Sequence, residues 1–174
     1  MKRIMTLGLP SLRPIEVGDV EALHKLWTDE QVRRFLWDGE VIPLERTQEI
    51  VEESCSLFDQ SGFGIWGVHD RISDELLGFT GYWYFRTPPS LELLFGVVPR
   101  HWNRGIATHS SRCVIRHGFE QLGFRTIEAS TDVANAASVR VLERLGMMLC
   151  RREVVDGLDT LFYRLKREDW HDVS

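Results

Sequence analysis

The sequence predicts an α/β protein of mixed α+β character, with a sheet of six or seven strands and helices on both faces. Apolar residues recur at two-residue spacing in some segments and at three- and four-residue spacing in others. These segments run as a strand, helices, several antiparallel strands, and then alternating strands and helices before a closing hairpin. With 174 residues and 43% hydrophobic content, the chain suffices for one core and is short for two. We therefore expect a single domain over residues 1–174.

The first third of the chain is expected to form one short strand and three helices. The strand is expected at 11–15, and Asp19 is expected to cap the helix that follows it. Four apolar residues share one face of that helix, and they are Val20, Leu23, Leu26 and Trp27. A second helical stretch is expected around 31–35. The third runs from about Pro43 to Leu57, because proline suits the first turn of a helix.

The middle of the chain has strand periodicity. Segments 63–69 and 76–85 predict a hairpin across the turn at 71–74. Alternation along the second segment places Tyr82 and Tyr84 on one face and Trp83 on the other. The run 91–98 is nearly continuous in apolar residues, which favours a strand buried on both faces in the middle of a sheet.

The last third alternates helices and strands. After the central strand, a glycine turn opens a helix that ends near Leu122 and Gly123. A strand at 125–131 and a helix from Asn135 to Leu145 follow, and Gly146 ends the helix. Segments 147–155 and 158–165 predict a final hairpin, because Asp156-Gly157 is a strong turn dipeptide.

The turn at Arg104-Gly105-Ile106-Ala107-Thr108 has the features of a phosphate-binding site. Backbone N–H groups at a helix N-terminus have no partners within the helix and lie at the positive end of its dipole, so they bind anionic oxygens. Gly105 allows close approach of the backbone, and Ala107 and Thr108 have small side chains. This turn is the first candidate site in the chain.

Composition excludes several classes of partner. Formal net charge is −5, from 26 acidic residues against 21 Lys and Arg, so no large basic surface for nucleic acid is expected. No apolar segment reaches the length of a membrane span, and the first eight residues lack the long apolar run of a secretion signal. The three cysteines, Cys55, Cys113 and Cys150, are odd in number and form no CxxC pair, which favours a reducing cytoplasm.

A metal site is not expected either. His109, Cys113 and His117 lie at four-residue spacing on one predicted helix. Three positions spread over two turns extend too far along the axis for one tetrahedral ion, so at most two of them could bind it.

From residues 12–14 to 163–170, the chain resembles the GNAT superfamily of acetyl-CoA-dependent N-acetyltransferases, and within it the RimJ/RimL-like branch of ribosomal-protein N-terminal acetyltransferases. The family's pyrophosphate signature, Gln/Arg-x-x-Gly-x-Gly/Ala, corresponds to residues 102–107, with Trp102 at the first position in place of the polar residue. A mostly antiparallel sheet whose central strands splay apart is implied by this resemblance.

The resemblance also implies how acetyl-CoA is held. Backbone groups of Phe95, Val97 and Val98 would bond the pantetheine arm like an added strand. The pyrophosphate would be held by the amides of Arg104, Gly105, Ile106, Ala107 and Thr108. Asn135 and Ser138 would touch the pantetheine from the other side of the opening. Open α/β sheets bind ligands at such openings, beyond the carboxyl ends of their strands.

The expected chemistry is attack of an amine on a thioester carbonyl, which a backbone N–H near Val97 would polarise. Glu92 is the candidate general base, because it is a carboxylate within the apolar strand leading to the acetyl site. Relatives often have a tyrosine acid where this chain has Leu142, so Ser138 or water would protonate the thiolate. Trp37, Tyr82 and Tyr84 are the candidate acceptor-binding residues.

Four points remain open at the level of sequence. The chain could be a non-catalytic acyl-CoA-binding or sensor module, or it could transfer a longer acyl group. The acceptor could be a protein N-terminus or a small-molecule amine. Monomer and homodimer are both compatible with the sequence.

Overall fold

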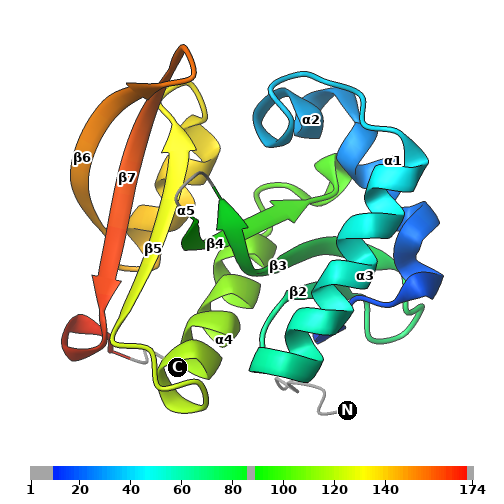
Figure 1. Cartoon of the computed structure of the whole chain (residues 1–174), viewed down its shortest axis with the longest axis horizontal. Helices are drawn as coiled ribbons and strands as arrows, with labels where there is room; N and C mark the ends of the chain where they lie inside the picture. Colours follow the sequence, from blue (N-terminus) through cyan, green and yellow to red (C-terminus); the bar gives the residue numbers. More distant parts are fainter. Residues whose placement is uncertain (1–9, 86–88, 172–174) are drawn as a thin grey trace.

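The computed structural model describes residues 10–85 and 89–171, and within them it forms one sheet flanked by helices (Figure 1). The strands are β1 (Ser11–Pro14), β2 (Ile65–His69), β3 (Leu76–Phe85), β4 (Ser90–Val97), β5 (Thr126–Asp132), β6 (Met148–Val155) and β7 (Leu158–Lys166). The α-helices are α1 (Val20–Thr28), α2 (Glu30–Leu36), α3 (Leu44–Ser61), α4 (Ile106–Glu120) and α5 (Ala136–Arg144). Short 3₁₀ turns are η1 (Val17–Asp19), η2 (Pro99–His101) and η3 (Arg167–Asp169).

The sheet has the order β1-β2-β3-β4-β5-β7-β6. Every neighbouring pair is antiparallel except β4 and β5, which are parallel and are connected through α4. The described part of the chain thus confirms a mixed, mostly antiparallel sheet of seven strands.

Helices cover both faces of the sheet, as predicted. On one face, α4 and α5 pack on inward side chains that include Tyr82 and Leu93. On the other, α1 and α3 pack on Ile65 and Phe79, and α2 adds side chains at the margin. In Figure 1, α1, α2 and α3 gather on one side of the molecule, and β5, β7 and β6 lie on the other.

The central strands β4 and β5 splay apart. In the described residues they share one register pair, Glu92 with Glu128, whereas β5 pairs with β7 from Thr126 to Asp132. The parallel strands therefore separate after Glu92, and a gap opens toward their carboxyl ends. This splay confirms the geometry that the family resemblance implies.

Two expectations about helix starts are wrong in detail. The side chain of Asp19 does not cap α1, because it accepts hydrogen bonds from Arg13 (2.7 Å) and from the backbone N–H of Glu16 (2.9 Å). Pro43 precedes α3 with extended backbone instead of forming its first turn. Neither change moves the apolar face of its helix, since Leu23 and Ile50 are buried as the periodicity predicts.

Strand β4 is not buried along its whole length. Leu94, Phe95 and Gly96 are only partly buried, although the apolar run favours complete burial. They lie where β5 has moved away, so the apolar composition of β4 marks the edge of the gap as well as the core. At the far end of the chain, Asp156 and Gly157 have φ values of 50° and 85°, as the predicted hairpin turn requires.

Candidate functional site

The gap is edged by main-chain groups of β4. The N–H of Val98, which directly follows β4, donates to the carbonyl oxygen of Leu77 near the start of β3 (2.9 Å). Successive residues of an antiparallel strand direct their N–H and C=O groups to opposite sides. The main-chain groups of Val97 and Phe95 therefore point away from β3 and into the gap. They are the polar groups that an extended ligand would meet there.

Val98 directs its main-chain groups differently from Phe95 and Val97, and its contact with the pantetheine arm stays a prediction. Its N–H is bonded to Leu77, and its carbonyl oxygen accepts from the N–H of His101 (2.9 Å). Both of its main-chain groups are thus engaged within the fold, because alternation turns them toward β3 and η2. Its side chain packs instead with the cluster that includes Trp83 and Leu94.

The glycine turn leads directly into α4. Gly105 is the N-cap residue with φ 75°, and Asn103 before it has φ 61°, so the chain is left-handed twice within three residues. A Cβ at Gly105 would meet nothing within 4 Å, so the requirement for glycine comes from its φ and not from crowding. The first helical hydrogen bond runs from the N–H of His109 to the carbonyl of Gly105 (2.9 Å).

The N–H groups of Ile106, Ala107 and Thr108 therefore have no acceptors within α4. These three residues are partly exposed, and the first turn contains no acidic side chain. The positive end of the helix is thus open to an anion supplied from outside. Arg104, beside it, is exposed.

The start of α5 lies beyond the carboxyl end of β5. Asn135 is its N-cap residue, and its side-chain oxygen accepts from the backbone N–H of Ser138 (3.2 Å). The side-chain amide N–H groups of Asn135 and the half-buried hydroxyl of Ser138 remain as polar groups at this helix start. Leu142 is buried, with 1% of its surface exposed.

Glu92 lies where the gap begins. Its neighbour Leu93 packs in the core beneath α4, so alternation directs Glu92 to the opposite face. The carboxylate is 3% exposed and accepts a hydrogen bond of 2.6 Å from the hydroxyl of Ser130 on β5. A buried carboxylate bridging the two splayed strands is suited either to proton transfer or to holding the strands together.

The aromatic residues of β3 divide between the faces as predicted, and Tyr82 lies on the face that α4 covers. Its side chain is 1% exposed and its hydroxyl donates to the carbonyl oxygen of Val114 in α4 (3.0 Å). Burial raises the pKa of this phenol above its ordinary value. Tyr84, on the same face, is 46% exposed and has its ring centroid 6.0 Å from that of Phe63.

Trp83 takes the other face, where Trp37 also packs. Both belong to the cluster at the margin of α1 and α2, and the ring centroid of Trp37 is 6.0 Å from that of buried Trp27. The register pairs Trp83 with Glu92 across β3 and β4. The aromatic residue that lies beside the candidate base is thus Trp83 instead of Tyr82. The alternation of side chains along β3 and β4 was the sequence signal that could have placed Trp83 on the same face as Glu92.

Sequence reasoning also missed Asp132, the last residue of β5. It lies two positions beyond Ser130, so it shares the face that Glu92 occupies. Partial burial raises the pKa of Asp132 above its ordinary value, and the negative charge of Asp38, in the turn after α2, raises it further. The charge of Asp38 therefore acts on Asp132, although the two residues lie on different elements.

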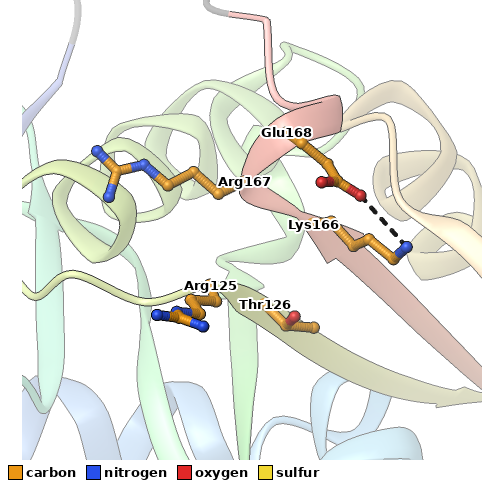
Figure 2. Close-up of a pocket in the computed structure, with 5 residues that line it drawn as sticks. All are labelled: Arg125, Thr126, Lys166, Arg167 and Glu168. Carbon is orange, nitrogen blue, oxygen red and sulfur yellow. Dashed lines mark hydrogen bonds and ion pairs between the residues drawn. The ribbon is translucent and has the colours of Figure 1, made fainter.

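A pocket elsewhere on the surface is not part of this site. Figure 2 shows it at the amino end of β5, lined by Arg125 and Thr126 together with Lys166, Arg167 and Glu168 from the end of β7 and η3. The exposed Lys166 side chain pairs with Glu168 at 3.4 Å. The splay opens at the opposite end of β5, so this pocket and the gap are separate features.

The part of the chain that the structure covers has no cluster of metal-ligating side chains. No group of three or more His, Cys, Asp and Glu side chains there could hold an ion. The ring of His117 lies near the carbonyl of Gly62 (3.2 Å), and that of His109 near the sulfur of Cys113 (3.8 Å).

None of the helices described here is both long and apolar enough to span a membrane.

The family model for the acetyltransferase (GNAT) domain matches residues 11–148, which include the gap, the glycine turn and α5. This chain belongs to the GNAT acetyltransferase family. It is an acetyl-CoA-dependent N-acetyltransferase. A relative described as the uncharacterized N-acetyltransferase YoaA of Bacillus subtilis (strain 168) is 26% identical over 136 residues, covering 78% of this chain and 77% of YoaA.

Solved GNAT structures share the fold across nearly the whole chain. An acetyltransferase from Agrobacterium tumefaciens superposes with a TM-score of 0.82 at 22% identity, covering 96% of this chain and 95% of the other. RimL, a ribosomal L7/L12 alpha-N-protein acetyltransferase in complex with coenzyme A, gives a TM-score of 0.79 at 19% identity, covering 95% and 98%. At these identities the likeness establishes the fold alone.

Proposed function

We propose that this GNAT enzyme transfers the acetyl group of acetyl-CoA to a primary amine by direct attack within a ternary complex. The observation that carries the proposal is the gap between β4 and β5, edged by main-chain groups of Phe95 and Val97 and followed by the open N-terminus of α4. A gap of this kind suits an extended arm that ends in a diphosphate.

Residues of β4 and of the starts of α4 and α5 would hold the co-substrate. The amides from Arg104 to Thr108 bind the pyrophosphate, since the first turn of α4 has N–H donors and no competing carboxylate. Phe95 and Val97 bond the pantetheine arm through their backbone, in the manner of an added strand. Asn135 and Ser138 contact it from the start of α5.

At the acyl carbon, the reaction forms one bond and breaks one. The neutral amine nitrogen attacks the thioester carbon, the carbon–sulfur bond breaks, the amine gives up a proton, and the thiolate is released. The N–H of Val97 stabilises the oxyanion that develops on the carbonyl oxygen. Glu92 accepts the amine proton, directly or through water, from its position on the acceptor face.

No dedicated acid is needed for the leaving group. Leu142 is buried and cannot donate a proton, so Ser138 or water serves the thiolate. A thiol has a pKa of about 8.5, which makes its anion a tolerable leaving group near neutral pH.

The acceptor is a protein N-terminal α-amine or a small-molecule amine. An α-amine with a pKa of roughly 8 is partly neutral at cellular pH, whereas a lysine near 10 is almost fully protonated. The half-buried Asp132 and the exposed Asp38 attract such cations to the opening. The likeness to RimL, which is described as acting on a protein N-terminus, makes peptides the first acceptors to test.

The test is release of coenzyme A when the protein, residues 1–174 as one domain, is mixed with acetyl-CoA and a panel of amines. Release that depends on an amine supports the proposal, and tight binding without release across a broad panel favours a sensor module. Faster release from a longer acyl-CoA would assign a different acyl group. Light scattering during the assay decides between monomer and homodimer.

A further inference from the structure

The side chain of Trp102 connects the two halves of the co-substrate site. Its indole N–H donates a hydrogen bond of 2.7 Å to the carbonyl oxygen of Val97. Val97 ends β4, whereas Trp102 directly follows η2 as its C-cap residue and begins the turn into α4. The residue is 41% exposed, so burial in the core does not account for the position of its side chain.

This hydrogen bond completes the fixing of one peptide unit. The unit between Val97 and Val98 has its N–H bonded to the carbonyl of Leu77 (2.9 Å) and its carbonyl bonded to Trp102. It is therefore held from both sides, by the neighbouring strand and by the indole. The N–H of Val97 lies in the preceding unit, and its direction depends on how firmly this one is held.

The segment that Trp102 spans is held by local bonds and by an ion pair between Arg100 and Glu75, which lies before β3. Between β4 and α4 the chain makes the short turn η2 and then passes through left-handed Asn103 and Gly105. The backbone N–H of Trp102 bonds only within that turn, to the carbonyl of Pro99 (3.1 Å). Among the hydrogen bonds described here, the indole contact is what ties this segment to the gap-facing backbone of β4.

We infer that Trp102 is a positioning residue that sets the distance between the phosphate-binding turn and the thioester-binding backbone of β4. The inference rests on the proposed use of this gap for acetyl-CoA. A ligand that occupies both places must match their separation, so the hydrogen bond of Trp102 contributes to affinity only when both are occupied at once. Phe95 and Val97 together direct four main-chain groups into the gap, and the indole of Trp102 already bonds one of them, the carbonyl oxygen of Val97.

The experiment compares two ligands on Trp102→Phe. One is acetyl-CoA, and the other is 3′-phosphoadenosine 5′-diphosphate, which carries the nucleotide and diphosphate without the thioester arm. Calorimetry should show acetyl-CoA binding weakened about fivefold, the effect of losing one neutral hydrogen bond, with the nucleotide unchanged. Turnover at saturating acetyl-CoA should fall as well, because the N–H of Val97 is less firmly directed.

Trp170→Phe is the matched control, because the indole N–H of Trp170 is buried without a hydrogen-bond partner among the described residues. It makes the same ring exchange and should leave both affinities unchanged. Should Trp102→Phe fold poorly, 3-benzothienylalanine at position 102 replaces only the N–H by sulfur and gives the same comparison.

Equal weakening of both ligands would overturn the inference, since Trp102 would then act on the phosphate turn alone. No weakening of either would overturn it too. Failure of the unaltered protein to bind acetyl-CoA, with the nucleotide still bound, would instead reject the proposed use of the gap.

Discussion

Glu92 on β4 lies directly opposite Glu128 on β5, and in the described residues this pair is where the two strands are in register. The two carboxylates have different partners. Glu128 is bonded by Arg164 on β7 (2.9 Å) and is partly exposed, whereas Glu92 is buried and bonded by Ser130. One therefore belongs to a surface ion pair, and the other faces the place where the strands separate.

Glu92→Gln should lower turnover by about a hundredfold, because glutamine keeps the hydrogen bond to Ser130 but cannot accept a proton. Affinity for acetyl-CoA should change little. Steady-state kinetics across pH with a fixed peptide amine is the measurement. Glu128→Gln is the matched control, because it alters the facing residue and should leave turnover near normal; equal rates for Glu92→Gln at every pH would remove Glu92 from the mechanism.

Gly105→Glu should abolish acetyl-CoA binding, since it adds a negative side chain at the open end of α4 and strains a backbone with φ 75°. Titration calorimetry measures the loss, and circular dichroism confirms that the variant is folded. Gly157→Glu imposes the same charge and similar strain, at φ 85°, in the β6–β7 turn. That variant should bind normally, and unchanged affinity in folded Gly105→Glu would refute the phosphate assignment.

Tyr82→Phe should reduce stability by about 1 kcal/mol and leave turnover intact, because it removes a buried hydroxyl that bonds the carbonyl of Val114. Urea unfolding gives the stability and the coenzyme A release assay gives the rate. A large fall in rate at unchanged stability would instead support a role for Tyr82 in binding the acceptor.

Asp132→Asn should make the protein more stable at neutral pH. The pKa of Asp132 is raised in the folded state by burial and then by Asp38, so the folded protein binds this proton more tightly than the unfolded chain does. The resulting stability is present below the unfolded pKa, ordinarily 3.8, and is lost as pH rises through the folded value. The variant's advantage should therefore disappear at acidic pH.

Denaturant unfolding at several pH values tests this expectation. In an Asp38→Asn background, part of the cause is absent and the gain from Asp132→Asn should shrink. A gain that stays constant with pH would show that hydrogen bonding or packing, and not charge, is responsible.

The elements and their order could be predicted because periodicity is local. Leu23 and Ile50 are buried as their spacing indicates, and Asp156-Gly157 forms its turn. The phosphate turn could also be predicted, since a glycine at a helix start is a short-range feature. Its φ of 75° is the physical reason for that residue.

The rest depended on register and on contacts distant in sequence. Alternation shows that Tyr82 and Trp83 point to opposite faces, but not which face α4 covers. The family resemblance named Val98 for the pantetheine arm, and its hydrogen bonds to Leu77 and His101 depend on the strand register and on the η2 turn. The effect of Asp38 on the pKa of Asp132 joins positions almost a hundred residues apart, which no local pattern records.

The splay of β4 and β5 also bears on how long the protein survives. A ligand that binds only the folded form stabilises it in proportion to its concentration. Here the ligand would fill the gap between β4 and β5 and bond the exposed backbone of β4. The amide hydrogens of Phe95 and Val97 should therefore exchange slowly with solvent only when the ligand is present. Resistance to proteolysis would then rise and fall with the supply of acetyl-CoA, and starvation for this metabolite would shorten the lifetime of the enzyme that consumes it.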